Sequence, residues 1–335
     1  MKKTGLTSAE IGILWTNYMQ NSMSLQILKY FNKTVDDDEI KTVVKTAIVN
    51  AESVLHEITL FFTEANLDIP VGFTEKDVNL SAPKLFSDYF MLVFLEIMGK
   101  TGLVAYALSQ GVSSRKDVRD FFSKNLMNTS KLFDLCVDTA KEKGTYVNPP
   151  LIKIQKGVEF IEGKKYFKQG IPPFYKRSLN AIEITHLFEN IKTNTLGVLA
   201  CTAFGQTTKS REVKKFLEDG KHISEKHVRI FTKALIEMDI TPSMNHDMAI
   251  TDSTTTVFSD KLIMYLMSVL SASGQGNYSA ASTASMRYDL VLDYQRLSVE
   301  IALFAKDGLD IMLKHNWMEE PPQALDRNQL SNIQN

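Results

Sequence analysis

The sequence predicts an all-α protein that consists of two similar four-helix bundles in tandem. Three observations point to this fold class: landmarks that recur at one spacing, apolar positions with helical periodicity, and no convincing alternating strand pattern in either half. The recurrence is the strongest signal. Leu6–Glu10 returns as Leu179–Glu183, and Phe86–Asp88 returns as Phe258–Asp260, at nearly the same offset along the chain. A period this long indicates an internal duplication of a whole domain rather than a solenoid of short repeats.

Capping signals place the first two helices of each unit. Thr7 stands three residues before Glu10, which is the spacing of a capping box at a helix start, and Asn180 and Glu183 repeat it in the second unit. The second helix of the first unit begins at the acidic residues 36–39, which favour the positive end of a helix dipole. Both units therefore open with a pair of helices joined by a short turn.

A long connection separates the second helix from the third. In the first unit, helix two ends before Pro70 and helix three begins at Ser87. The roughly 16 residues between Pro70 and Phe86 can span about 50 Å when extended, more than the length of about 38 Å of a 25-residue helix. Such a crossover is typical of ferritin-like bundles, whereas an up-down bundle needs only a short loop there. We therefore predict two tandem ferritin-like four-helix bundles, each ending before paired prolines (149–150 and 321–322).

These landmarks divide the chain into four segments. We expect a first bundle at 1–150, an interdomain strap at 151–178, a second bundle at 179–322 and a polar tail at 323–335. The strap is strongly basic, so it could contact an anionic partner. The alternative is that one side of it is solvated while apolar residues such as Phe160 pack onto the bundles. Its lysines include Lys153, Lys156, Lys164, Lys165 and Lys168.

Composition excludes several classes of protein. The 335 residues hold 38 Lys plus Arg against 39 Asp plus Glu, so no global charge attracts nucleic acid, and two cysteines exclude a disulfide scaffold. The N-terminus lacks an apolar run of signal-peptide length, which favours a cytoplasmic location. Residues 89–109 are apolar enough to suggest a membrane span, but Glu96 and Lys100 interrupt them. We interpret that stretch as a buried bundle helix.

Several segments together resemble a known family. They are LTSAE and LNAIEITHLF at the helix starts, FSD at both third helices, GNY, MRYDLVLDYQRL and DGLDIMLKHNWMEEPPQALDR. With them the sequence resembles the uncharacterised tandem ferritin-like family of spore-forming bacilli, a domain of unknown function sometimes labelled "putative spore coat protein". The resemblance covers nearly the whole chain. It implies a fold and an association with sporulation, and it implies no established activity.

The di-iron pattern of ferritin-like enzymes is missing from the sequence. Those enzymes use a carboxylate on each of two helices and a Glu-x-x-His motif on each of the other two. This chain has one such motif, Glu183 to His186, and it lies at a helix cap. In helix two of the first unit, Glu52 and His56 are four residues apart, which is the wrong spacing. Ferroxidase and oxygenase chemistry are therefore disfavoured, and no catalytic residue is assigned.

A smaller polar site is predicted at mid-height in the second bundle. His227 lies on the apolar face of helix two, and counting from the helix ends puts His186, Gln275, Tyr278 and Glu300 at the same level. Ligation by His227, Glu300 and His186, with Gln275 and Tyr278 beside them, would suit Zn²⁺ or Fe²⁺. The alternative is a core histidine hydrogen-bonded by Tyr278 or Glu300. His186 points away from the apolar stripe of its own helix, so it faces either the core or an interface.

The equivalent level of the first unit is expected to be filled with hydrocarbon. Ile13, Val54 and Leu103 stand there, with Asn128 in place of Glu300. We therefore expect Val54→His to destabilise the protein more than His227→Val does, because a new imidazole would be buried without a partner.

The sequence is consistent with two functions. The first is a non-catalytic, ferritin-like structural or interaction protein linked to sporulation or stress, without a cofactor and with a second copy or a spore coat protein as its partner. The alternative is a protein that binds a single metal ion or a small ligand in the core of the second bundle. Metal content separates the two.

Overall fold

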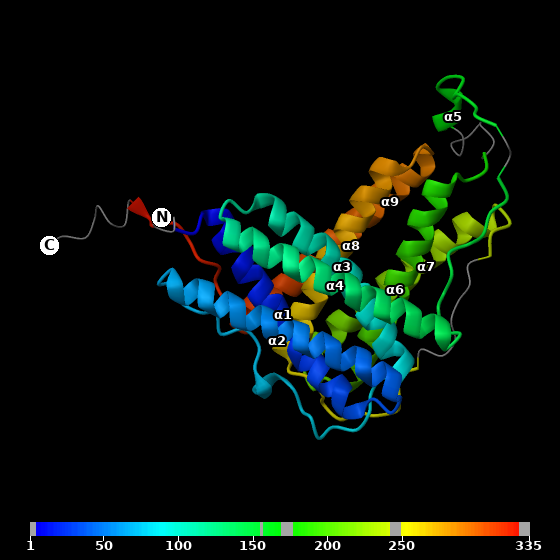
Figure 1. The fold of residues 1–335 in the computed structure, drawn as a ribbon. Coiled ribbons are helices and arrows are strands. Elements are labelled where there is room, and N and C mark those ends of the chain that lie inside the picture. Colours follow the sequence, from blue (N-terminus) through cyan, green and yellow to red (C-terminus); the bar gives the residue numbers. More distant parts are fainter. Residues whose placement is uncertain (1–4, 155–156, 169–176, 242–248, 328–335) are drawn as a thin grey trace.

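The computed structural model describes residues 5–154, 157–168, 177–241 and 249–327, and it is all-α. No strand occurs in these ranges; two isolated β-bridges do. Four helices form each bundle, as the sequence predicts, and Figure 1 shows the two bundles side by side. The first contains α1 (Ser8–Thr34), α2 (Asp38–Glu64), α3 (Asp88–Val112) and α4 (Lys116–Glu142), and the second contains α6 (Ala181–Thr207), α7 (Arg211–Ile236), α8 (Asp260–Ala284) and α9 (Tyr288–Lys314).

Both predicted capping boxes are present. The Thr7 hydroxyl accepts a hydrogen bond from the backbone N–H of Glu10, and the Glu10 carboxylate accepts one from the backbone N–H of Thr7. Asn180 and Glu183 make the same reciprocal pair at the start of α6. These bonds satisfy backbone donors that a helix start leaves free, so both boundaries follow from local sequence.

The crossover between α2 and α3 returns the chain to the end of the bundle where α1 turns into α2. The Asp88 carboxylate at the start of α3 accepts hydrogen bonds from the backbone N–H groups of Asp36 (3.1 Å) and Asp37 (2.7 Å), at the start of α2. The second bundle repeats this closure, since Thr208 donates to Asp260 at 2.6 Å. Helices α2 and α3 therefore run parallel, and the long connection includes the short helix η1 (Glu75–Asp77).

The two crossovers pair with each other across a pseudo-two-fold axis. Val78 bridges to Phe258, and Phe86 bridges to Ile250, and the offset between the two units exchanges one bridge for the other. The flanking hydrogen bonds obey the same exchange: the Asn79 N–H donates to Val257 O at 2.7 Å, and the Thr251 N–H donates to Leu85 O at 3.0 Å. The duplicated units thus pack as the two halves of an isologous dimer would.

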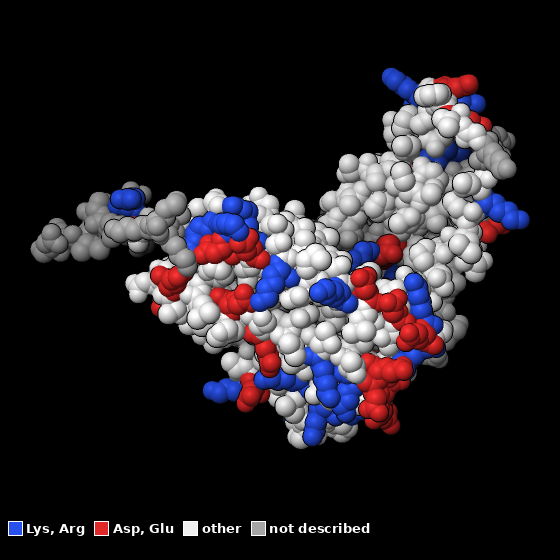
Figure 2. Space-filling model, in the orientation of Figure 1, with Lys and Arg blue, Asp and Glu red and all other residues white. Residues whose placement is uncertain are grey.

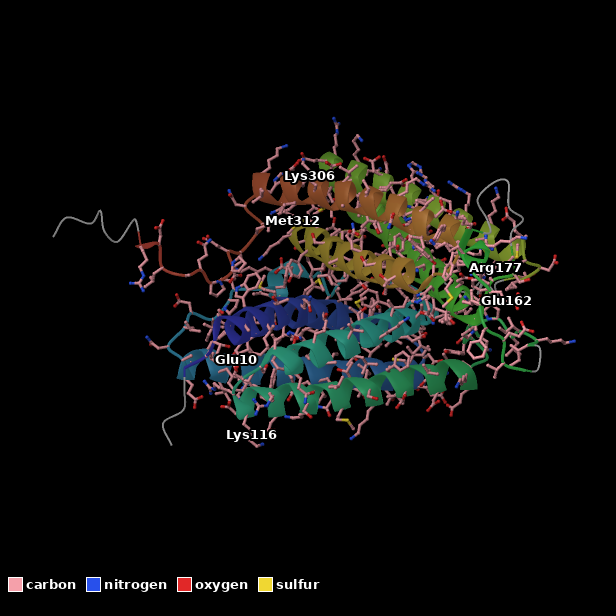
Figure 3. The ribbon with its side chains drawn as sticks, turned by 90° about the horizontal axis from the view of Figure 1, so that it is seen from above. Glu10, Lys116, Glu162, Arg177, Lys306 and Met312 are labelled. Atoms are coloured by element: carbon pink, nitrogen blue, oxygen red, sulfur yellow. The ribbon has the colours of Figure 1, made fainter. Side chains whose placement is uncertain are left out.

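A continuous hydrophobic core crosses this axis. Rings of Phe31, Phe86, Phe204 and Phe258 follow one another edge to face, with centroids 5.7, 6.0 and 6.1 Å apart. Buried residues of both bundles belong to the same cluster, so the interface is core rather than surface contact. Figure 3 views this arrangement from above, with Lys306 of α9 and Lys116 of α4 on opposite outer sides.

Helix α3 is the helix within the described ranges that is long and apolar enough to cross a membrane. Half of its most apolar 18-residue stretch is buried in the fold, and residues from Tyr89 to Leu95 all belong to the shared core. On the α3–α6 side, Glu96 pairs with Lys192 at 2.5 Å, and Lys100 pairs with Glu189. The stretch is thus a bundle helix, as the sequence predicts, and its apolar residues also serve packing between the bundles.

The strap differs from what the sequence suggested. Side chains of Ile154, Val158 and Phe160 are 80 to 89% exposed and do not pack onto the bundles. Within the described part of the strap, contact with the second bundle is made near the short helix α5 (Lys165–Lys168), where Phe167 lies against Tyr288 of α9 at 6.1 Å between ring centroids, and at Arg177, which binds Glu183 of α6. Among the strap lysines, Lys153, Lys164, Lys165 and Lys168 are exposed, and Lys156 lies outside the described residues.

Candidate functional site

The predicted mid-height site of the second bundle is a buried hydrogen-bond network centred on His227. The imidazole of this α7 residue is fully buried. Its Nδ1 lies 2.8 Å from the Tyr278 hydroxyl of α8, and its Nε2 lies 3.3 Å from Glu300 Oε2 of α9. The side-chain amide of Asn194 on α6 donates to the Tyr278 oxygen at 2.8 Å. Each helix of the second bundle thus contributes one group.

The network defines the tautomer of His227. Because Asn194 donates to the Tyr278 oxygen, the phenol directs its own proton at Nδ1 of the histidine. The remaining ring proton then sits on Nε2, where it points to the Glu300 carboxylate. Both ring nitrogens are engaged, which is the satisfied core histidine that the sequence left open as one alternative.

Two cations neutralise the carboxylate of this network. Lys226 Nζ lies 2.8 and 2.9 Å from the two oxygens of Glu300, and Arg296 lies 3.5 Å from one of them. Burial raises the pKa of Glu300, but hydrogen bonds from Lys226 and His227 outweigh it and hold that pKa below its usual value. Burial lowers the pKa of His227, and Glu300 offsets only part of this effect. The imidazole is therefore neutral near pH 7.

Two of the predicted site residues lie elsewhere. Gln275 donates to the backbone oxygen of Ser298 at 2.6 Å rather than joining the network. His186 is half-buried on the side of α6 that faces the first bundle: burial lowers its pKa, and the charge of Lys100 on α3 adds to that shift. The face of α6 that carries His186 thus lies at the interface between the bundles, and the structure does not bring His186 to His227.

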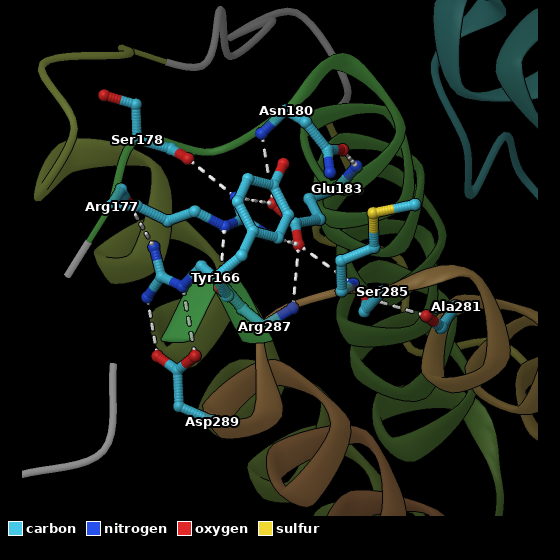
Figure 4. Close-up of polar contacts among 10 residues, drawn as sticks. Tyr166, Arg177, Ser178, Asn180, Glu183, Ala281, Ser285, Arg287 and Asp289 are labelled. Atoms are coloured by element: carbon cyan, nitrogen blue, oxygen red, sulfur yellow. Dashed lines mark hydrogen bonds and ion pairs between the residues drawn. The ribbon is translucent and has the colours of Figure 1, made fainter. Parts of the chain in front are cut away.

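Glu183, the acid of the lone Glu-x-x-His motif, is occupied by structural contacts (Figure 4). Its carboxylate accepts hydrogen bonds from the backbone N–H groups of Met286 and Arg287 at the start of α9, both at 3.0 Å. The two terminal nitrogens of the Arg177 guanidinium donate hydrogen bonds to the two carboxylate oxygens of Glu183, at 2.7 and 2.9 Å. Burial raises the pKa of Glu183, and the Arg177 and backbone hydrogen bonds outweigh this and lower it. The residue ties α6 to α9 and is not a free ligand.

The donor set at His227 does not fit a metal ion. A structural zinc site uses four protein ligands and a catalytic one uses three. Here His227 and Glu300 are the donors, the histidine proton faces the carboxylate, and Lys226 already binds that carboxylate. Within the described ranges no group of three or more His, Cys, Asp or Glu side chains could hold a metal.

Sequence reasoning missed three members of the network. The sequence could have indicated Asn194, because Asn21 stands at the equivalent position of the first unit and each unit also has the tyrosine. In the structure Asn21 likewise donates to Tyr106, at 3.4 Å. Nothing in the sequence distinguishes Lys226 and Arg296 from the many solvent-facing cations on amphipathic helices. Their shared pairing with Glu300 becomes visible only in the folded structure.

The equivalent level of the first bundle is hollow, which corrects the expectation of a hydrocarbon-filled centre. Val54 replaces His227 and Asn128 replaces Glu300, while Tyr106 and Asn21 are retained. A cavity of about 140 Å³ lies there. The corresponding cavity of the second bundle measures about 80 Å³. The valine side chain is shorter than the imidazole at the same position of the second bundle, so it leaves space at this level.

Phe304 explains much of the difference in size. It stacks on Phe216 with ring centroids 4.1 Å apart, and the pair fits over Gly220, where an added Cβ would lie 2.7 Å from the Phe304 ring. The first bundle has Leu132 and Val43 at the positions of these two rings. Aromatic packing thus fills the second bundle at a level where aliphatic side chains leave space in the first.

The chain matches a known protein family over both of its units. The family described as "Protein of unknown function (DUF3231)" matches residues 1–158 and again residues 173–330. The chain belongs to this family. The two matches confirm the internal duplication inferred from the sequence, and with them the resemblance stated above.

The chain also shows similarity to a protein of known structure. The chain is similar to a "putative spore coat protein" of Bacillus halodurans, with 21% identity and a TM-score of 0.41. The match covers 45% of this chain and 98% of that one. No curated protein matches the chain.

Proposed function

We propose that this DUF3231 protein is a non-catalytic structural or interaction protein of the sporulating cell. One observation supports a non-catalytic role: the polar groups in the centre of the second bundle are hydrogen-bonded to one another. His227 is fully buried with both ring nitrogens engaged, and Glu300 is held by Lys226. A general base needs a free nitrogen within reach of its substrate. The family resemblance supports the link to sporulation, and the location that we propose is the cytoplasm, with an association with the spore.

An apolar stripe on the outer face of α9 supports the interaction part. Six large side chains between 40 and 59% exposed line up along the helix; Phe167 of the strap packs against Tyr288, and within the described residues the monomer gives no partner to the other five. The equivalent positions of α4 are mostly charged. The stripe contains Tyr288, Leu292, Val299, Leu303, Leu309 and Leu313.

A second copy of this chain is the partner that we propose for the stripe. The charged residues on and beside this face pair within the helix, Lys306 with Asp310 at 2.7 Å and Arg296 with Asp293 at 2.9 Å. The partner therefore needs an apolar surface without excess charge, and another copy of the stripe is such a surface. The two stripes would meet around a two-fold axis. Figure 2 shows one face of the molecule, on which acidic and basic side chains are interspersed.

The oligomeric state tests the interaction, with a matched pair of variants. Val299 on α9 and Met127 on α4 occupy equivalent positions and are 59 and 57% exposed. We expect light scattering after size-exclusion chromatography to give a dimer for the wild type and for Met127→Glu, and a monomer for Val299→Glu. A monomeric wild type at micromolar concentration, or a dimer that survives Val299→Glu, overturns this part of the proposal.

Elemental analysis tests the alternative of a metal-binding second bundle. We expect protein purified without chelator or affinity tag to contain less than about one-tenth equivalent of any transition metal, and Zn²⁺ or Fe²⁺ not to raise its melting temperature, since a tight native-state ligand must stabilise the fold. Stoichiometric metal that disappears in His227→Ala and persists in His56→Ala would refute the non-metal assignment. His56 is exposed on α2, so it serves as the matched control.

A further inference from the structure

The two bundles contain equivalent cavities at mid-height. Most lining positions of the first cavity reappear in the second when the offset between the two units is applied. Each cavity also borrows one wall residue from the opposite bundle: Val269 of α8 reaches the first, and Ile97 of α3, its equivalent, reaches the second. The hollow is thus a feature of the repeated unit and of its pairing, rather than an isolated packing defect.

The lining of the first cavity is neutral throughout. Apolar side chains form one part of it, among them Met23, Phe94, Leu95 and Met98. Side-chain amides form another part: Asn17 and Asn125 are buried, whereas Asn50 and Asn128 are half-buried. Of the residues that the structure describes, no Asp, Glu, Lys, Arg or His lines the cavity. Such a surface suits an uncharged molecule with one apolar and one polar side.

Three buried polar groups on this lining lack a full set of partners. Tyr106, 7% exposed, accepts a hydrogen bond from Asn21, but within the described ranges nothing accepts its own proton. The amides of Asn17 and Asn125 donate to Ile13 O and Phe121 O of their own helices, and their oxygens receive no hydrogen bond from any described residue. The Tyr106 proton and these two amide oxygens are therefore available to a molecule that enters the cavity.

The second bundle indicates what kind of group completes this arrangement. There the Tyr278 proton is taken up by the imidazole nitrogen of His227, a flat ring in the middle of the bundle. Val54 stands at that position in the first bundle and offers no acceptor. The volume of about 140 Å³ is close to the roughly 150 Å³ of an engineered protein cavity that admits benzene.

We propose that the first cavity binds a small, uncharged, planar ring compound that carries a hydrogen-bond acceptor and an N–H or O–H donor. The ring lies among Phe94, Met23 and Met98, the acceptor receives the Tyr106 proton, and the donor reaches the oxygen of Asn17 or Asn125. Benzamide has this chemistry and size, since its carbonyl accepts and its amide group donates. This binding site is independent of the dimer proposed above.

Charge distinguishes this site from a nonspecific apolar pocket. Benzoate has the shape of benzamide but would bring a full negative charge into a lining without a cation among the described residues. Burying an unpaired charge is far costlier than burying a hydrogen-bonded amide. Benzoate should therefore bind at least about ten-fold more weakly than benzamide, although an apolar pocket open to water would treat the two rings alike.

Ligand-observed NMR and calorimetry on the full-length protein test the site. We expect saturable binding of benzamide with one site per chain and at least ten-fold weaker binding of benzoate. Tyr106→Phe should weaken benzamide about ten-fold, because one hydrogen bond is lost. The matched variant Tyr278→Phe should leave its affinity unchanged, since Tyr278 belongs to the second bundle.

Two further variants fill the cavity without deleting a polar group. Leu132→Phe introduces the ring that Phe304 supplies in the second bundle, and Val54→His introduces the imidazole that His227 supplies there. Both should abolish benzamide binding while the far-UV circular dichroism spectrum stays that of the wild type. Absence of benzamide binding to the wild type, equal binding of benzoate, or unchanged binding in folded Leu132→Phe would each overturn the proposal.

Discussion

His227→Val replaces the buried imidazole with the residue that the first bundle has at the same level. It removes two hydrogen bonds, to Tyr278 at 2.8 Å and to Glu300 at 3.3 Å. Tyr278 keeps Asn194, and Glu300 keeps Lys226, so no buried charge is left alone. At about 1 kcal/mol net for each bond, we expect the free energy of unfolding at pH 8 to fall by about 2 kcal/mol.

The stability difference between wild type and His227→Val should shrink as the solution becomes acidic. Burial holds the pKa of His227 below its usual value, so between about pH 6.5 and the folded pKa the unfolded chain binds a proton that the folded chain does not. Stability of the wild type then falls with decreasing pH by at most about 1.4 kcal/mol per pH unit. The valine variant lacks this contribution, and in it Glu300 also loses one of the hydrogen bonds that lower its pKa.

Urea unfolding followed by circular dichroism between pH 5.5 and pH 8 measures this difference. The exposed His56→Ala variant is the control and should stay within about 0.5 kcal/mol of the wild type throughout. A difference between wild type and His227→Val that is independent of pH, or that grows toward low pH, would refute the assignment of a neutral, doubly bonded imidazole.

Two further substitutions probe packing and the interface. Gly220→Ala should lower stability by about 1–3 kcal/mol, because its Cβ would lie 2.7 Å from Phe304, whereas Gly276→Ala, with nothing within 4 Å, should be neutral or stabilising in the same calorimetric scan. Equal losses for both glycines would contradict the packing argument. Lys192→Ala should cost about 2 kcal/mol or more by leaving Glu96, 8% exposed, without its cation. Restored stability in the double variant with Glu96→Gln would support that cause, and an unchanged single variant would exclude it.

Local sequence was sufficient for the fold because the decisive signals are short-range. The capping boxes at Thr7 and Asn180 depend on residues three apart, and the crossover was visible as a length that no hairpin needs. The pairing of His227 with Tyr278 and Glu300 followed from counting along straight helices of equal length. Because the rise per residue is constant in a straight helix, the positions of the helix ends were sufficient to predict which residues meet at the centre of the bundle.

The sequence could not indicate where cavities remain between the packed side chains. A list of apolar residues at one level gives their chemistry but not whether they touch, and Val54 looked like filling when it is the wall of a cavity. The comparison of substitutions is reversed for the same reason: Val54→His should cost less than His227→Val, because the cavity has room and Tyr106 has a proton to donate. The orientation of His186 likewise depended on the placement of the other bundle.

The paired crossovers have a consequence for how such a protein can change. In a symmetric dimer of identical half-chains, every substitution is made twice, so a polar ring in one half imposes the same ring on the other. Joining the halves in one chain removes that coupling, and this chain carries a histidine at one of the two positions and valine at the other. Joining them also makes their association an intramolecular step, set by the tether and independent of protein concentration. One half can then keep the shared core in place while its twin acquires a different interior.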